Sequence, residues 1–322
     1  MKSAREPGIA AALRALVRGT VREAEPLARS TTYRIGGPAT LLSPAAPEDV
    51  GIAVRFAQQQ GLAWFALGLG SNLLFPDAGL DALVIRLGRG LDQLEPLDGG
   101  RWRVGAGLPQ PIAARKTSEA GFRGLHRFVG VPGSVGGGVY MNAGCHGGDW
   151  AEIVQSAIVV NPDGTDRVLA RAEIPFAYRS SGLGHQVVLQ TTVQLVPADP
   201  VTIQAEVAEL FRWRQEGTPF NQPCCGSVFR NPGGPSWEHR DGPRTAGQLI
   251  DAVGLKGARE GGAQISPMHA NYFVNTGGAT AADVRALMRR ARAAVEQQFG
   301  VRLDAEVKVI SPAGSTTPAE EF

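Results

Sequence analysis

The residues best suited to chemistry in this 322-residue chain lie in a glycine-rich run at residues 130–144, in which six of fifteen residues are glycine. Glycine reaches positive φ and carries no Cβ, so backbone N–H groups in such a run can point at an anion such as a pyrophosphate. The same composition also fits plain tight turns between strands. We expect a loop, with positive φ at Gly133 and Gly137. Its candidate cofactor-binding residues are Val131, Pro132, Gly133, Ser134, Gly137, Asn142 and Gly144.

A second glycine turn follows the apolar residues 62–67 and carries Gly68, Gly70, Ser71 and Asn72 as candidate cofactor ligands. The spacing of Gly68 and Gly70 lacks the third glycine of the dinucleotide-binding G-x-G-x-x-G pattern, and no G-x-x-x-x-G-K-[ST] loop occurs. These absences argue against a Rossmann unit and a P-loop. The two turns together favour a phosphate site of another kind.

Three further segments hold polar side chains where plain turn or strand residues would be expected: 178–181, 226–232 and 303–308. Each also has a purely structural interpretation, as a polar hairpin end, a turn, or the outward face of the last strand. No serine-hydrolase elbow, zinc-ligand spacing or carboxylate pair stands out. Hydrolytic chemistry therefore has little support, and no metal is expected.

Eight runs in the same order make the chain resemble the UDP-N-acetylenolpyruvoylglucosamine reductase family. They are residues 30–37, 68–74, 130–144, 178–181, 226–232, 246–251, 262–266 and 304–307. Members of that family are flavoproteins that hold FAD in a fold like that of vanillyl-alcohol oxidase. The resemblance implies an α+β fold class: a two-part FAD-binding domain of the vanillyl-alcohol-oxidase/PCMH type plus a C-terminal α+β substrate-binding domain. The short connection after residue 181 resembles the compact class of the family.

The resemblance also implies an activity. It is the NADPH-dependent, FAD-mediated reduction of UDP-N-acetylglucosamine enolpyruvate to UDP-N-acetylmuramate, a cytoplasmic step of peptidoglycan precursor synthesis that serves cell wall biogenesis, cell shape and cell division. We expect non-covalent FAD, because neither glycine turn contains His or Cys; Cys145 and His146, just beyond, are the nearby candidates for a covalent link. The alternatives are another FAD oxidoreductase of this fold, such as an alcohol or sugar oxidase, and a flavin-free nucleotide-sugar binding protein.

The implied reaction defines the groups that the site must contain. Hydride addition to the terminal vinyl carbon leaves negative charge on the carbon that bears the carboxylate. A cation, a proton donor and a group that orients the carboxylate suffice in principle. By resemblance these are Arg179 as the cation, Ser227 as the acid, and Glu306 as the partner that helps to stabilise the intermediate. The same resemblance assigns substrate binding to Tyr178, Arg214 and Asn231.

The chain departs from the family pattern at two places. Gly217 stands where a basic residue is expected, and Arg212 or Arg214 could replace that contact. Cys224 and Cys225 stand where small residues are usual, which we interpret as a packing change. With Cys145 they make three cysteines without disulfide or zinc spacing, so reduced thiols are expected.

Composition restricts the partners. Charged residues make up 19% of the chain and the formal net charge is +2, which does not indicate a nucleic-acid partner. No apolar run approaches the ~20 residues of a membrane span, and the N-terminus lacks the apolar core of a signal peptide. We expect a cytoplasmic protein that binds NADPH and a UDP-linked enolpyruvyl ether, with no membrane partner; its oligomeric state is left open.

Apolar periodicity and turn signals place these residues on three units. Residues 1–87 form a first FAD-binding part to which a last strand at 305–310 could return, 88–203 form a second, and 204–310 bind substrate; the Pro/Ser/Thr/Glu-rich tail 311–322 is expected to be disordered. Helices are predicted at 9–17, from 47, at 112–120, 203–216, 245–253 and after the capping box 280–283. Strands are predicted at 62–67, 82–87, 102–104, 154–160, 167–169, 189–195 and 272–275, with a β-prone run at 30–37 and a connecting passage at 219–227.

Overall fold

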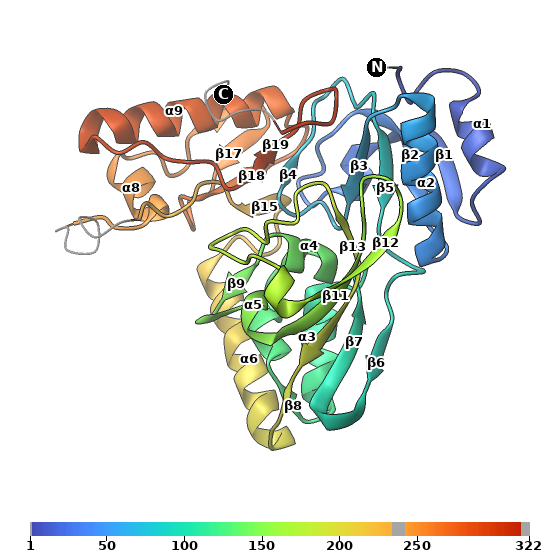
Figure 1. The fold of residues 1–322 in the computed structure, drawn as a ribbon. Coiled ribbons are helices and arrows are strands. Elements are labelled where there is room, and N and C mark those ends of the chain that lie inside the picture. The colour runs from blue at the N-terminus through green and yellow to red at the C-terminus, as the bar shows by residue number, and fades with distance from the viewer. Residues whose placement is uncertain (1, 234–241, 317–322) are drawn as a thin grey trace. The chain divides into compact units, whose positions relative to one another are not determined.

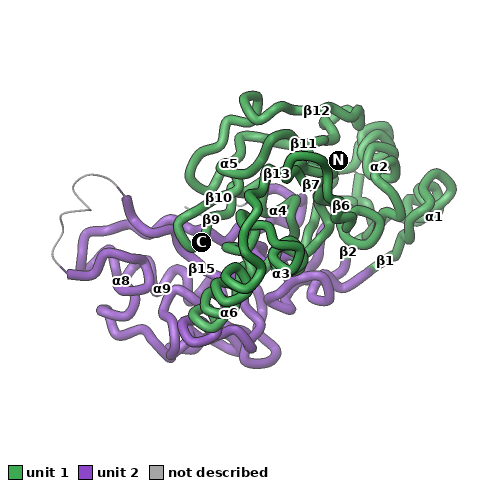
Figure 2. The backbone as a smooth tube through the Cα atoms, turned by 90° about the horizontal axis from the view of Figure 1, so that it is seen from below, with its two compact units in different colours: residues 1–24, 39–69, 81–214 green, residues 25–38, 70–80, 215–322 purple. Residues whose placement is uncertain are grey.

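The computed structural model describes residues 2–233 and 242–316 (Figure 1). Contacts divide the chain into two compact units, coloured separately in Figure 2. Unit 1 comprises residues 1–24, 39–69 and 81–214, and unit 2 comprises residues 25–38, 70–80 and 215–322. Within the predicted tail, the Ser311 N–H donates to the Ser315 carbonyl at 2.8 Å and closes a turn, and residues 317–322 lie outside the described residues.

Unit 1 contains a mainly parallel sheet and an antiparallel sheet. The first has the order β1 (Thr20–Pro26), β2 (Pro38–Ser43), β5 (Leu83–Arg86), β3 (Trp64–Leu67), and β5 runs parallel to both β2 and β3. The second has the order β12 (Asp166–Ala170), β11 (Val154–Val160), β13 (Val187–Gln194), β7 (Arg101–Gly105), β6 (Leu94–Pro96), with antiparallel neighbours throughout. Buried side chains of both sheets belong to one apolar core, which includes Leu42, Ile85, Val104 and Val193.

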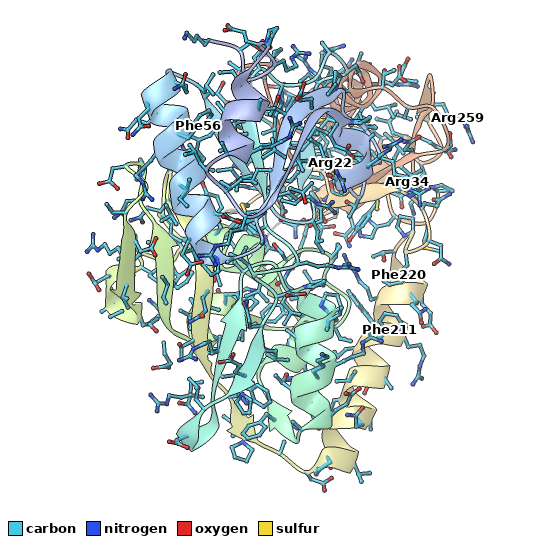
Figure 3. The ribbon with its side chains drawn as sticks, turned by 90° about the vertical axis from the view of Figure 1, so that its right-hand side faces the viewer. Arg22, Arg34, Phe56, Phe211, Phe220 and Arg259 are labelled. Carbon is cyan, nitrogen blue, oxygen red and sulfur yellow. The ribbon has the colours of Figure 1, made fainter. Side chains whose placement is uncertain are left out.

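Two long helices of unit 1 follow from local signals. Helix α2 (Pro47–Gln60) begins with proline and two acidic residues, ends at Gly61 with φ +67°, and buries Phe56 in the core. Helix α6 (Pro200–Gly217) packs its Val207 against Ala114 of α3 (Gln110–Glu119), with Phe211 on the same face (Figure 3). The shorter elements are α1 (Ile9–Arg14), α4 (Val135–Tyr140), α5 (Trp150–Ile153), β8 (Phe122–Arg123), β9 (Gly144–Cys145), β10 (Gly148–Asp149), β14 (Val196–Pro197) and the 3₁₀ turns Asp98–Gly100, Leu125–Phe128 and Arg171–Glu173.

Unit 2 packs helices on a four-stranded antiparallel sheet. Its order is β15 (Cys224–Ser227), β18 (Tyr272–Asn275), β17 (Ala263–Ile265), β16 (Arg259–Glu260). Helices α8 (Ala246–Ala252) and α9 (Ala281–Phe299) bury Leu249 and Leu287 in its core. Strand β19 (Lys308–Val309) runs parallel to β4 (Leu73–Leu74), and Leu27–Ser30 form a 3₁₀ turn. Within the described ranges, no helix has both the length and the apolar character that a bilayer crossing requires.

Several predicted elements are confirmed where the signal is local. The capping box at residues 280–283 opens α9: the Asp283 N–H donates to Thr280 Oγ1 at 3.1 Å, and the Thr280 N–H donates to Asp283 Oδ2 at 3.0 Å. The predicted strands at 154–160 and 167–169 form β11 and β12, which a turn joins as an antiparallel hairpin; in this turn the Gly164 N–H donates to the Asn161 carbonyl at 2.9 Å. Strand β18 has the predicted bounds.

Four element predictions are wrong or incomplete. The glycine run at 130–144 is not only loop, since it contains α4. The β-prone run at 30–37 forms the end of a 3₁₀ turn and irregular chain, because the Tyr33 ring is fully buried in the core of unit 2 rather than alternating along a sheet. The passage at 219–227 contains β15, and the last strand is limited to β19, because only Lys308 and Val309 pair with β4.

A buried histidine connects two elements of unit 1. His126 is 6% exposed; its Nδ1 accepts the Gly124 N–H at 3.0 Å, and its Nε2 lies 3.7 Å from Glu206 Oε2 on α6. Burial lowers its pKa from 6.5 to about 4; the carboxylate of Glu206 opposes this shift, and the charges of Arg127 and Arg123 add to it.

Stability should therefore fall as the pH drops from about 6.5 toward 4. In this window the unfolded chain binds a proton at His126 that the folded chain does not, and the full shift corresponds to about 3 kcal/mol at most. His126→Asn retains a short acceptor for the Gly124 N–H but does not titrate, so its unfolding free energy should decline less over the same window. Urea unfolding at a series of pH values measures both slopes. Identical slopes in the two proteins would contradict a buried neutral His126.

Candidate functional site

The two glycine turns of the sequence come together in unit 1 at Gly68 and Ser134. Gly68 follows β3, and a Cβ built on it would collide with Ser134 Oγ. Ser134 is 1% exposed and is the N-cap residue of α4, where its Oγ accepts the Gly137 N–H at 3.3 Å. A side chain at residue 68 is therefore excluded by the side chain of Ser134 while it caps α4.

Most N–H groups at the start of α4 are already used inside the protein. Val135 donates to the Leu108 carbonyl and Gly136 to the Ala106 carbonyl, both at 2.8 Å. Among the described residues, the N–H groups of Gly133 and Ser134 have no acceptor, although both residues are buried. Buried N–H groups are nearly always paired, so these two donors fit the phosphate ligand that the sequence predicts. The part of the run that offers N–H groups to an anion is thus limited to Gly133 and Ser134.

The predicted reason for Gly137 is wrong, although its exposure is compatible with a ligand. Gly133 has φ +135°, as predicted, but Gly137 is helical, and a Cβ there would meet only Ser134 Oγ at an ordinary 3.5 Å. The neighbouring glycines, Gly136 and Gly138, are the positions at which there is no space for a Cβ. A Cβ on Gly136 would lie 2.7 Å from Ala106 Cβ, and one on Gly138 would lie 2.5 Å from Gln110 Oε1. Gly137 instead faces outward and leaves the first turn of α4 open.

Asn142 organises the end of the glycine run. It is 3% exposed at φ +43°, and its Nδ2 donates to Asp149 Oδ2 at 3.0 Å and to the Ala177 carbonyl at 3.1 Å. Its Oδ1 accepts the Ala151 N–H at 3.0 Å. The amide bonds satisfy protein groups on two segments, residues 149–151 and the turn at 177, so the structural contribution of Asn142 is to hold the loop.

Arg179 lies against the same run. It occupies a tight turn at φ +56°, and its Nη1 approaches the Gly144 carbonyl at 3.4 Å. Its guanidinium carbon lies 5.1 Å from the centre of the Tyr178 ring, which is 61% exposed. Ser181 fixes the turn by donating its Oγ–H to the Tyr140 carbonyl at 2.7 Å. The predicted cation and its tyrosine neighbour thus lie beside a predicted cofactor residue.

Arg214 approaches the run from α6. A Cβ on Gly130 would lie 2.7 Å from Arg214 Cγ, so the side chain of Arg214 covers that glycine. Burial raises the pKa of the Cys145 thiol, whereas Arg214 and Arg179 lower it, so both cations act on the same group. The structure therefore places Arg179, Arg214 and Gly144 around Cys145 in unit 1. No covalent role for Cys145 is needed to explain this arrangement.

The second glycine turn continues in unit 2. Gly70 has φ +62°, and a Cβ there would lie 2.6 Å from the Ser30 carbonyl oxygen. The Thr32 N–H donates to the Gly70 carbonyl at 3.3 Å. Ser71 follows directly, and the Asn72 carbonyl accepts the Lys308 N–H at 3.0 Å. This stretch is fixed at Gly70 by residues 30–32 and at Asn72 by the segment that contains Lys308.

A β-bulge sets the position of Ser227. Cys224 pairs with Val274 and Ser227 with Tyr272, so two residues of β15 face one residue of β18. Gly226 has φ +77° within this bulge, although a Cβ on it would meet nothing within 4 Å. Conformation, rather than space, therefore requires glycine immediately before Ser227.

Glu306 joins the same framework through its backbone. Its N–H donates to the Val228 carbonyl at 2.8 Å, next to Ser227, and its carbonyl accepts Asn72 Nδ2 at 3.1 Å. Unit 2 thus brings Asn72, Ser227 and Glu306 together from three distant parts of the sequence. Half-buried Lys308 lies nearby: burial and Arg230 lower its pKa, and the carboxylate of Glu306 opposes them.

Asn231 has a local structural task. Its Oδ1 accepts the Ala246 N–H at 3.1 Å at the start of α8, beside the capping box formed by Thr245 and Gln248. This bond holds the chain after Ser227 to the first turn of α8. A substrate contact at Asn231 would use its amide N–H₂ group.

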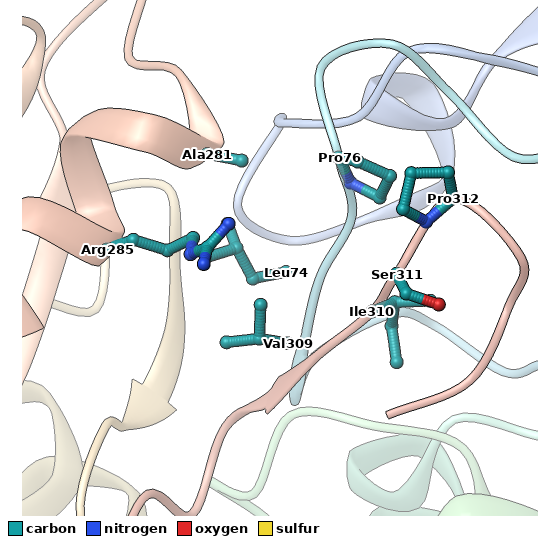
Figure 4. A pocket seen from close by; sticks show the side chains of 8 residues that line it. All are labelled: Leu74, Pro76, Ala281, Arg285, Val309, Ile310, Ser311 and Pro312. Atoms are coloured by element: carbon teal, nitrogen blue, oxygen red, sulfur yellow. The ribbon is translucent and has the colours of Figure 1, made fainter. Parts of the chain in front are cut away.

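The sequence did not reveal the residues that fix Ser227 and Glu306. Asn271 is the main example, because its amide bonds twice to the backbone of Phe229. An asparagine before a predicted strand is an ordinary turn residue, so no local signal marks it. Unit 2 also has a cavity of about 250 Å³, into which Arg285 points from α9 (Figure 4). It is lined by Leu74, Pro76, Ala281, Arg285, Val309, Ile310, Ser311 and Pro312, and no predicted site residue is among them.

Comparisons with known proteins match most of the chain. A family model described as "FAD binding domain" matches residues 38–170, and one described as "UDP-N-acetylenolpyruvoylglucosamine reductase, C-terminal domain" matches residues 218–310. These matches confirm the predicted α+β fold class and FAD as the cofactor.

Relatives that align over most of their length support the same family. A curated UDP-N-acetylenolpyruvoylglucosamine reductase from Halalkalibacterium halodurans is 42% identical over 92% of this chain and 97% of its own length. One from Bacillus velezensis is 41% identical over 91% of this chain and 94% of its own. The crystal structure of the reductase from Thermus caldophilus aligns with a TM-score of 0.77 and 34% identity, covering 90% of this chain and 99% of that one.

Two neighbouring glycines of α4 provide a matched test of the cofactor turn. Gly137→Ala should leave the fold stable, since its Cβ has room, but should lower FAD content because the exposed turn is where a cofactor would approach. Gly138→Ala should destabilise the protein by roughly 1–3 kcal/mol, since its Cβ would collide with the Gln110–Trp150 hydrogen bond. Thermal unfolding and the flavin-to-protein absorbance ratio separate the effects. A Gly137→Ala protein with full FAD content would remove Gly137 from the site.

Proposed function

This chain belongs to the UDP-N-acetylenolpyruvoylglucosamine reductase family, and we propose that it reduces UDP-N-acetylglucosamine enolpyruvate to UDP-N-acetylmuramate with NADPH, through FAD. The observation that carries the proposal is the hydrogen-bonded framework of unit 2, in which the Val228 carbonyl accepts the Glu306 N–H beside Ser227. An acid and a carboxylate are thus held by backbone bonds rather than by flexible side chains.

The glycine turns supply the groups that would hold FAD. In unit 1 these are Gly68, Val131, Pro132, Gly133, Ser134, Gly137, Asn142 and Gly144, and in unit 2 Gly70, Ser71 and Asn72. The buried N–H groups of Gly133 and Ser134, which have no acceptor among the described residues, support a closely bound phosphate group. When bound, FAD accepts a hydride from NADPH and passes it to the substrate.

The chain's own residues manage the charge that hydride addition creates. The added hydride forms a C–H bond at the terminal vinyl carbon, and the π electron pair of the broken double bond moves to the carbon bearing the carboxylate, where it is delocalised into that carboxylate. Arg179 supplies a fixed positive charge for this anion, and Glu306 helps to position and stabilise the intermediate. Ser227 Oγ–H then donates its proton to the carbanionic carbon and regains a proton from solvent. NADPH and one solvent proton are consumed for each substrate reduced.

The remaining assignments concern binding and organisation. We assign Tyr178, Arg214 and Asn231 to substrate binding, because Tyr178 and Arg214 lie beside Arg179 and its loop and Asn231 follows Ser227. Residues 1–87 and 88–203 would serve FAD, and 204–310 the substrate, which the two matched family models support. A cytoplasmic location is proposed, where NADPH and a nucleotide sugar are available.

Two spectroscopic steps test the proposed function. Purified protein should show flavin absorbance, lose the visible band of oxidised flavin with NADPH, and recover it anaerobically only when the enolpyruvyl substrate is added. Acid precipitation should release the flavin into the supernatant. Rapid reoxidation by oxygen without a response to the enolpyruvyl substrate would instead favour an oxidase.

Ser227→Ala should separate the two half-reactions. FAD reduction by NADPH needs no acid at Ser227 and should remain nearly intact, whereas reoxidation by the enolpyruvyl substrate should slow by about 10²–10⁴-fold, the usual contribution of general acid catalysis. Ser227→Cys should recover part of the loss, because a thiol can also donate. Stopped-flow spectra of each half-reaction measure both. Equal losses in the two would mean that Ser227 maintains the shape of the site and that the acid lies elsewhere.

A further inference from the structure

Asn271 takes the place of a strand residue beside the segment that carries Ser227. Its Oδ1 accepts the Phe229 N–H at 2.9 Å, and its Nδ2 donates to the Phe229 carbonyl at 2.8 Å. Its own carbonyl accepts the Val228 N–H at 2.9 Å. Asn271 is 3% exposed and Phe229 1% exposed, so these bonds are shielded from water. Three hydrogen bonds from one residue therefore fix the two residues that follow Ser227.

The opposite side of that segment contacts the chain that carries Glu306. The Val228 carbonyl accepts the N–H groups of Glu306 at 2.8 Å and Val307 at 3.2 Å, and the Arg230 N–H donates to the Asp304 carbonyl at 2.8 Å. Phe229 and Ala305 form an isolated antiparallel bridge. The residues after Ser227 are thus held between Asn271 on one side and residues 304–307 on the other.

Without the Asn271 amide, the segment after Ser227 would be held on one side only, by residues 304–307. Phe229 would have a buried N–H and a buried carbonyl without partners, and such groups are costly to leave unsatisfied. The segment would shift to recover those bonds, and its pairing with Glu306 would shift with it. Phe229 is also packed against Phe273 of β18, 6.1 Å between ring centres, which keeps it from leaving the core altogether. A displacement of the site is expected rather than loss of the sheet.

We propose that Asn271 is a positioning residue for this reaction: its amide fixes the register between Ser227 and Glu306. The inference rests on the proposed function, because it assigns Asn271 to the step in which Ser227 donates its proton. Asn271 touches neither substrate nor cofactor in this role. It acts through the backbone of Val228 and Phe229.

Asn275, the last residue of β18, provides a matched control. It is also a buried asparagine, 8% exposed, whose Nδ2 donates to the Tyr33 carbonyl at 3.0 Å and whose Oδ1 accepts the Gly277 N–H at 2.9 Å. It has the same chemistry and comparable bonds, but none of those bonds goes to residues 227–230 or 304–307. Comparing the two alanine variants therefore separates positioning from general stability.

In FAD-loaded protein, Asn271→Ala should slow reoxidation by the enolpyruvyl substrate by about 10²-fold, the effect of a misplacement near 1 Å, while FAD reduction by NADPH stays within about twofold. Asn275→Ala should leave the ratio of the two half-reactions unchanged. Hydrogen exchange of peptides containing Phe229 and Glu306 gives a readout independent of activity, and exchange should quicken in Asn271→Ala only. Equal slowing of both half-reactions in Asn271→Ala, or the same selective loss in Asn275→Ala, would overturn the proposal.

Asn271→Asp keeps the test decisive if the alanine variant does not fold. Its carboxyl group can accept the Phe229 N–H, but it donates to the Phe229 carbonyl only when protonated. Reoxidation by the substrate should therefore improve as the pH falls and the carboxyl protonates, relative to wild type at each pH. A pH profile parallel to wild type would refute the positioning role. If wild-type FAD is not reoxidised by the enolpyruvyl substrate at all, the proposed function fails, whereas the exchange experiment still judges the restraint.

Discussion

The close approach of a glycine to a second chain segment, with no space for a Cβ, is the constraint on which both units depend. In unit 1 the turn at Gly68 contacts Ser134, and in unit 2 Gly70 contacts the carbonyl of Ser30. Each contact joins segments that are far apart in the sequence, and neither tolerates a side chain. The 42 glycines of the chain are therefore not simply a sign of flexibility. At these positions glycine permits a rigid arrangement that no other residue allows.

Local signals made much of the fold predictable. The capping box at Thr280 and the Asn161–Gly164 turn specify their structures through bonds between residues a few positions apart, so the sequence contains the whole signal. Helix α4 is the opposite case. Three consecutive glycines have poor intrinsic helix propensity, yet the segment is helical because Ser134 caps it and the Ala106 carbonyl takes one of its free N–H groups. Such tertiary partners cannot be identified from the segment itself.

The candidate site shows the same division. Resemblance to a family identified Ser227 and Glu306 as functional candidates, but their juxtaposition depends on the Val228 carbonyl, which no pattern indicates. A polar side chain in a motif did not by itself show a ligand contact, because the side-chain amide oxygens of Asn142 and Asn231 accept hydrogen bonds from protein N–H groups. The sequence predicts that these residues have a role in the loops that they occupy. Whether each amide serves a ligand or the backbone depended on distant chain segments.

Buried asparagines explain how irregular chain can hold a precise site. Loops at the ends of sheets leave N–H and carbonyl groups that no neighbouring strand satisfies, and burial makes each such group costly. An asparagine amide presents one donor group and one acceptor in the geometry of a peptide, so it can satisfy a residue as a missing strand would. Asn142 does this for the loop before Gly144, and Asn271 for Phe229. Rigidity at the site thus comes from side chains that imitate backbone, which lets a functional segment leave the sheet without becoming mobile.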